Sequence, residues 1–98
     1  MVFFKTQEFI TWFNGQNNKT QGIIQARLLR IENDNHWGMI NKFDELIELK
    51  WTGGLRIYTA KINNITVILL GGGNKNGQSK DIQKAKSLLK KIQGNASS

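Results

Sequence analysis

Residues 46–58 read LIELKWTGGLRIY, and this stretch decides the fold that the sequence predicts. Polar and apolar side chains alternate on both sides of the Thr52-Gly53-Gly54 turn, as in two strands of an antiparallel hairpin. The apolar face carries Ile47, Leu49, Trp51, Leu55 and Ile57. The polar face carries Glu48, Lys50, Arg56 and Tyr58. We therefore expect the apolar face to cover helices and the polar face to be left for solvent or a ligand.

Further strands are expected on both sides of this hairpin. Residues 65–70 are almost wholly apolar, which is typical of the centre of a sheet, and Gly71-Gly72-Gly73 is expected to end that strand. Residues 39–43 and 2–4 are compatible with two short additional strands.

Three helices complete the expected order of elements. Thr6 is a suitable N-cap for a helix that places Phe9, Trp12 and Phe13 on one face. A second helix is expected over residues 18–32, and Ser79 is a suitable N-cap for a last one. The sequence thus predicts an α+β fold with a twisted, mainly antiparallel sheet, two N-terminal helices and one C-terminal helix. We expect a single domain over residues 1–93 and a flexible tail over residues 94–98.

Composition excludes several classes of protein. The chain has 98 residues, the size of one domain, and 39% of them are hydrophobic, so wholesale disorder is excluded. It has no cysteine, which excludes disulfides and thiolate metal sites. No apolar run approaches the length of a membrane span, and the first residues do not resemble a signal peptide. We expect a soluble, cytoplasmic protein that does not bind membranes.

The net charge of +7 is unevenly distributed. Residues 1–49 carry five basic and six acidic side chains, whereas residues 50–98 carry nine basic side chains and one acid, Asp81. A C-terminal half this basic favours an anionic partner, most plausibly a nucleic acid, although lysines also serve to solvate helices and strands.

Two familiar catalytic arrangements are absent from the sequence. His36 is the single histidine, so neither a site with two imidazoles nor a well-supported Ser-His-Asp triad is available. The glycine run before Lys75 departs from a P-loop, because Gly77 is followed by Gln78 where the motif requires lysine. We expect neither a metal nor another cofactor.

The order and spacing of several short motifs resemble the RelE/HigB toxin superfamily, and more narrowly its phage-derived "addiction module killer" branch. The segments that carry the resemblance are Phe9 to Phe13, Ala26 to Leu28, Glu48 to Lys50, Leu55 to Tyr58, Leu69 to Lys75, Gln78, Asp81-Ile82 and Ala85. The resemblance covers nearly the whole chain, about residues 2–92. The resemblance implies a RelE/ParE-like fold and a toxin of a type II toxin–antitoxin system that cleaves mRNA on the ribosome without a metal. It also implies a cognate antitoxin, often a helix-turn-helix protein.

The same resemblance assigns the site residues. Arg56 matches the family's strand arginine and would stabilise charge at the phosphate, and Lys75 would bind phosphate or donate a proton to the leaving oxygen. Lys50 stands where the family has arginine and would act as a base if nearby cations depressed its pKa. The residues expected to contact RNA are Tyr58, by stacking on a base, the helix lysines Lys80 and Lys84, and His36. His36 is either an alternative acid or base or simply a histidine on a surface loop.

Two other functions remain open at this point. A ParE-like protein would have the same fold but would inhibit DNA gyrase, which does not require a nuclease site. A non-catalytic module would bind only its antitoxin or RNA.

Overall fold

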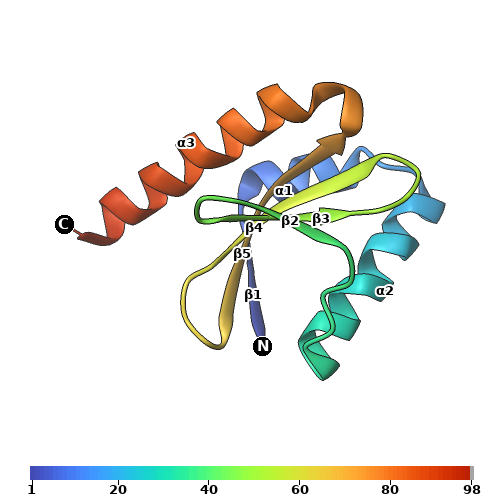
Figure 1. The fold of residues 1–98 in the computed structure, drawn as a ribbon, viewed down its shortest axis with the longest axis horizontal. Helices are drawn as coiled ribbons and strands as arrows, with labels where there is room; N and C mark the ends of the chain where they lie inside the picture. Colours follow the sequence, from blue (N-terminus) through green and yellow to red (C-terminus); the bar gives the residue numbers. More distant parts are fainter. Residues whose placement is uncertain (98) are drawn as a thin grey trace.

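The computed structural model describes residues 1–97 and the side chains of residues 1–94, so the last residue of the expected tail lies outside the described residues. Figure 1 shows the arrangement of five strands and three long helices. In chain order the elements are β1 (Val2–Lys5), α1 (Gln7–Asn14), α2 (Asn18–Asp34), β2 (Ile40–Phe43), β3 (Leu46–Lys50), β4 (Leu55–Lys61), β5 (Thr66–Asn74), the short 3₁₀ helix η1 (Lys75–Gly77) and α3 (Gln78–Ser97).

The strands form one sheet in the order β1-β5-β4-β3-β2. All neighbouring strands are antiparallel except β1 and β5, which are parallel. Helices α1 and α2 cover one face of the sheet and α3 covers the other. The α+β fold with a mainly antiparallel sheet, two N-terminal helices and one C-terminal helix is therefore confirmed. Among the described residues, no helix is long and apolar enough to cross a membrane.

Thr6 places α1 against the sheet. Its hydroxyl accepts a hydrogen bond from the Phe9 backbone N–H at 3.1 Å, as predicted for an N-cap, and donates one to the carbonyl of Leu69 at 2.8 Å. One side chain thus starts α1 and ties it to β5. The core on this face is apolar and fully buried. It consists of Phe9, Ile24, Leu28, Ile31, Leu49, Ile57, Val67 and Leu69.

The opposite face of the sheet is covered by α3, which corrects one expectation. We expected the polar face of the β3–β4 hairpin to be open, but much of it is buried in a second core beneath α3. The apolar stripe of α3 requires a surface to cover, and the other face is already occupied by α1 and α2. This second core consists of Leu46, Tyr58, Ala60, Ile68, Leu70, Ala85 and Leu89.

Three predicted boundaries also differ from the structure. The glycine run does not end β5, which continues to Asn74 because Gly71, Gly72 and Gly73 pair with β4. The last helix begins at Gln78, two residues before Lys80, the first helical residue expected from a Ser79 cap. It also continues to Ser97, past the boundary expected at residue 93.

An irregularity in β5 sets which way these glycines face. Tyr58 pairs with Gly71 and the next residue, Thr59, pairs with Leu69, so Leu70 is an extra residue in β5. Such a bulge reverses the alternation of the strand beyond it. Gly72 consequently faces α1 and Gly73 faces α3.

Candidate functional site

The polar side chains of the hairpin form two rows across β3, β4 and β5. In the first row, Lys50 lies opposite Arg56, which in turn lies opposite Gly73. In the second row, Glu48 lies opposite Tyr58, which lies opposite Gly71. The strand register therefore brings Lys50 and Arg56 together, as their positions on either side of the turn predicted.

Arg56 is held rigidly at the end of the sheet. Its side chain is largely buried, and its Nη1 donates hydrogen bonds to the carbonyls of Trp51 at 3.0 Å and Leu55 at 2.9 Å. Its Nε lies 3.9 Å from Oε1 of Glu48 and has no hydrogen-bond partner among the described residues. No described residue accepts a hydrogen bond from Nη2 either, so this nitrogen is the donor left for a ligand.

Glu48 is completely buried and lies next to the Arg56 guanidinium. Its Oε1 accepts a hydrogen bond from Asn41 Nδ2 at 3.1 Å, and its Oε2 accepts one from Gln78 Nε2 at 2.8 Å. A buried carboxylate is tolerated when it is hydrogen-bonded and has a cation nearby, and here Arg56 is that cation. Glu48 therefore has a structural role and links β2, β3 and the start of α3.

Tyr58 does not have the exposure that base stacking requires. Its side chain is only 1% exposed beneath α3, and its hydroxyl has no hydrogen-bond partner among the described residues. Burial, with a further contribution from the carboxylate of Glu48, raises the pKa of Tyr58 above its ordinary value of 10.0. In this conformation Tyr58 is a core residue, which corrects its expected place on an open face.

Lys75 lies at the same end of the sheet as Arg56. Its backbone N–H donates a hydrogen bond to the carbonyl of Gly54 at 2.9 Å, and its side-chain stem passes close to Gly54. Because Gly54 belongs to the turn between Lys50 and Arg56, the structure gathers all three predicted catalytic cations around the β3–β4 turn. Lys75 is exposed and Lys50 is half-buried.

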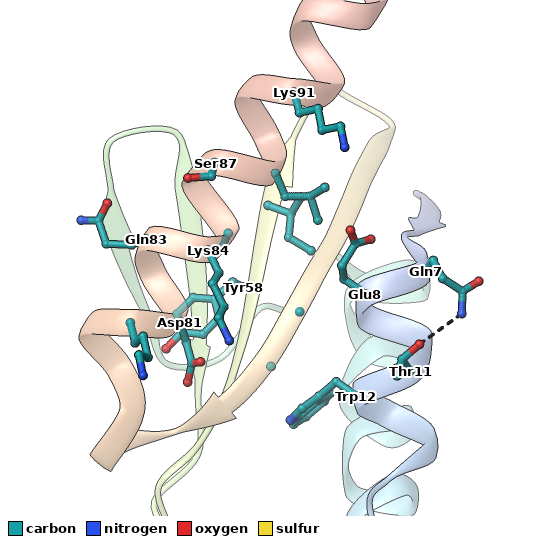
Figure 2. A pocket seen from close by; sticks show the side chains of 16 residues that line it. Gln7, Glu8, Thr11, Trp12, Tyr58, Asp81, Gln83, Lys84, Ser87 and Lys91 are labelled. Atoms are coloured by element: carbon teal, nitrogen blue, oxygen red, sulfur yellow. Dashed lines mark hydrogen bonds between the residues drawn. The ribbon is translucent and has the colours of Figure 1, made fainter.

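The predicted RNA contacts Lys80 and Lys84 lie elsewhere, on a groove between α1 and α3 that we call the α1–α3 groove (Figure 2). Its volume is about 1020 Å³, and Gly71 and Gly72 of β5 form its floor. Lys80, Lys84 and Lys91 extend along the α3 wall, while the α1 wall carries Glu8 and Trp12. The groove thus has three lysines and Asp81 on the α3 wall, and an acid and an aromatic ring on the α1 wall.

His36 does not line the α1–α3 groove. It is exposed in the loop after α2 and lines a different groove, together with Arg27, Arg30 and Trp37. The surface-loop interpretation of His36 therefore agrees with the structure, and His36 is not brought into the α1–α3 groove.

Three residues organise the site in ways that the sequence did not predict. Asn41 contacts Glu48 only because β2 pairs with β3 in one particular register. Gln78 reaches Glu48 from 30 residues away in the sequence. Asp81 is placed against Gly73 by the packing of α3. Among the described residues, no group of three His, Asp or Glu side chains could hold a metal ion.

Comparison with known proteins gives a family and a fold. No protein-family model matches the chain. An uncharacterized protein of Haemophilus influenzae is 33% identical over 90 residues, which cover 89% of this chain and 91% of that protein. An identity of this extent over nearly the full length of both proteins shows common descent.

Two solved structures resemble the fold at low sequence identity. The intact Escherichia coli RelBE toxin–antitoxin complex matches with a TM-score of 0.61 and 9% identity, over 74% of this chain and 93% of that chain. The RelB–RelE antitoxin–toxin complex from Methanococcus jannaschii matches with a TM-score of 0.63 and 13% identity, over 79% of this chain and 95% of that chain. The chain therefore belongs to the same family as the Haemophilus influenzae protein and has a RelE-like fold.

Proposed function

We propose that this protein is the toxin of a type II toxin–antitoxin pair and that it cleaves mRNA on the ribosome. The fold shared with two toxin–antitoxin complexes supports the class of protein. The observation that carries the activity is the gathering of Lys50, Arg56 and Lys75 around the β3–β4 turn. Three cations at one end of a sheet suit a substrate whose reacting group is a phosphate.

The proposed reaction is an attack of the RNA 2′-oxygen on the adjacent phosphorus. The new O2′–P bond forms as the P–O5′ bond breaks, so the 2′-hydroxyl loses a proton and the 5′-oxygen gains one. Nη2 of Arg56 would donate to the phosphate as negative charge develops on it. Lys50, as a neutral amine, would accept the proton of the 2′-hydroxyl, and the ammonium of Lys75 would donate a proton to the 5′-oxygen.

The burial pattern supports an approach of the substrate at one end of the hairpin. The row of Glu48 and Tyr58 is covered by α3, whereas Lys75 is exposed and Lys50 is half-buried. The RNA would therefore approach the edge of the site at the turn and not the centre of the sheet face. The antitoxin partner would block this edge and so prevent cleavage.

The test compares charge-preserving and charge-removing variants during induced expression. Arg56→Lys keeps a cation beside buried Glu48 but loses the guanidinium geometry, so the protein should remain folded. We expect Arg56→Lys and Lys75→Ala to lower the rate of mRNA cleavage by about 10²-fold or more, as for other donors to a transition state. Lys61→Ala, which removes an exposed cation at the far end of β4, is the matched control.

The measurements distinguish mRNA cleavage from the two alternative functions. Cleavage is measured by mapping the 5′ ends of translated messages, and folding is checked by thermal unfolding of each purified variant. Growth arrest with intact messages would contradict the nuclease assignment, and gyrase-dependent DNA breaks in those cells would indicate a ParE-like inhibitor. Ribosome binding without cleavage would indicate a non-catalytic module.

A further inference from the structure

A second groove, which we call the α2 groove, lies between α2, the loop after it and the β3–β4 turn. Its volume is about 460 Å³, within the range of roughly 300–1,000 Å³ that is typical of small-molecule sites. Its lining residues are Ile23, Ala26, Arg27, Arg30, His36, Trp37, Gly38, Met39, Lys50, Trp51 and Thr52. Of the three predicted catalytic cations, Lys50 lines this groove, whereas Arg56 and Lys75 do not.

The lining residues of the α2 groove make it suited to an anion. Arg27, Arg30, His36 and Lys50 are basic, and none of the described residues that line the groove is Asp or Glu. The α1–α3 groove differs, because Glu8 and Asp81 stand among its lysines. Three of these four basic residues, Arg27, Arg30 and His36, come from residues 1–49, the half of the chain whose net charge is slightly negative.

Arg27 holds the elements around the groove together, and its guanidinium is occupied by contacts within the protein. Its guanidinium donates hydrogen bonds to the carbonyls of Trp37, Met39 and Lys50, and it lies 4.3 Å from the centre of the Trp51 ring. Gly38 passes so close that a Cβ there would stand 3.2 Å from Arg27 Nη2. The loop is consequently fixed against α2, and Arg30 and His36 are the exposed basic residues on the groove.

Trp37 offers an aromatic surface in the same groove as Arg30 and His36. Its indole Nε1 donates a hydrogen bond to Asn35 Oδ1 at 2.9 Å, which fixes the orientation of the ring. The ring is half-buried, and exposed Ile23 and Met39 lie in the same groove. One face of Trp51 is already covered by Arg27, so Trp37 is the ring we expect a planar ligand to stack on.

We propose that the α2 groove binds a nucleotide of single-stranded RNA, with its base against Trp37 and its phosphate at Arg30 and His36. A base has an aromatic face and a phosphate has the charge, which together match the groove. Lys50 connects the groove to the Arg56 site, so a strand that passes the β3–β4 turn can reach both. The choice of RNA as ligand rests on the proposed function, but the binding requires neither a ribosome nor cleavage.

The test uses the indole N–H signals of the three tryptophans in a nitrogen-15 NMR titration of the full chain. Trp37 and Trp51 line the α2 groove, and Trp12 lines the α1–α3 groove and serves as an internal control. The ligands are a uridine pentanucleotide, 5′-UMP, uridine and inorganic phosphate. We expect the pentanucleotide to shift the Trp37 signal at the lowest concentration, and 5′-UMP to shift it more weakly.

Two exposed cations of α2 give a matched pair of variants. Arg30→Ala should weaken pentanucleotide binding about fivefold, and the slope of log affinity against log salt concentration should decrease in magnitude by about one. Lys19→Ala, outside the groove, should leave the affinity and the slope unchanged. Trp37→Leu should weaken binding at least about fivefold through loss of stacking. Lys61→Ala, which lies outside both sites, should bind as the wild type does, and because the titration requires no cleavage its result does not depend on the nuclease proposal.

Four results would overturn the proposal. The first is a shift of Trp12 without Trp37, which would place the RNA in the α1–α3 groove. The second is equal affinity for 5′-UMP and the pentanucleotide, which would indicate a free nucleotide as the ligand. The third is equal weakening by Lys19→Ala and Arg30→Ala. The fourth is displacement of the pentanucleotide by an equal concentration of an oligoglutamate peptide, which would indicate a site for acidic protein segments.

Discussion

The indole of Trp12 lies directly on Gly72: a Cβ placed on this glycine would stand 2.5 Å from three atoms of the ring. Trp12 comes from α1 and Gly72 from β5, so the contact sets how closely the helix approaches the strand. The same strand brings Gly73 against Asp81 of α3, where a Cβ would stand 2.1 Å from Oδ2. Successive glycines thus allow the close approach of helices on opposite faces of the sheet.

Gly72→Ala should therefore destabilise the protein by about 1–3 kcal/mol, because a rigid ring has to move to make room. Gly71→Ala is the matched control: nothing stands within 4 Å of its Cβ position, so we expect no loss of stability. Urea unfolding of the two variants measures the difference. Equal stability of both would show that α1 does not rest on Gly72 in solution.

The buried hydroxyl of Tyr58 should make the protein sensitive to alkali. Because the folded-state pKa of Tyr58 is raised, the unfolded chain releases this proton first as the pH rises. The stability contributed by the neutral phenol is complete below about pH 10, the unfolded value, and declines above it. Tyr58 is the single tyrosine, so tyrosinate absorbance should appear only as the protein unfolds.

Tyr58→Phe separates this effect from packing. At neutral pH the variant should match the wild type in stability or exceed it by up to about 1 kcal/mol, because the hydroxyl that is removed has no partner among the described residues. Above pH 10 the variant should lose less stability than the wild type. Ionisation of the wild-type phenol in the folded protein near its ordinary pKa would contradict the burial.

The hydrogen bond from Gln78 to buried Glu48 should fasten the start of α3. Gln78→Ala leaves Oε2 of Glu48 without this donor and should cost about 1–3 kcal/mol. Gln83→Ala changes an exposed glutamine of the same helix and should stay within about 0.5 kcal/mol of the wild type. Chemical denaturation compares the two, and similar losses would mean that α3 is held by its apolar stripe alone.

Arg27 and Arg30 should differ sharply in their effect on stability. Arg27→Met removes the donor to three backbone carbonyls and should cost about 2–3 kcal/mol, with a displaced indole signal for Trp37. Arg30→Met alters an exposed side chain on the same helix and should change stability by less than about 0.5 kcal/mol. A negligible effect of Arg27→Met on both readouts would show that the loop is held by other contacts.

Much of the architecture was predictable from local patterns. The alternation around Thr52-Gly53-Gly54 predicted a hairpin in which Lys50 and Arg56 are neighbours, and Thr6 predicted the start of α1. These inferences succeed because strand alternation and helix capping depend on residues close together in the chain. The glycine run was misjudged as the end of a strand, because its reason lies in Trp12 and Asp81, which are distant in sequence.

By itself the sequence determined the fold class and the hairpin that pairs Lys50 with Arg56, since both follow from periodicity and turn chemistry over short distances. Only the tertiary structure brought Lys75 to the same turn, through its backbone hydrogen bond to Gly54. Only the tertiary structure decided that α3 covers the polar face and buries Glu48 and Tyr58. It alone also assembled the α2 groove from a helix, a loop and a turn. Both outcomes depend on which surfaces the helices bury against the sheet, and that choice is made by packing over the whole chain.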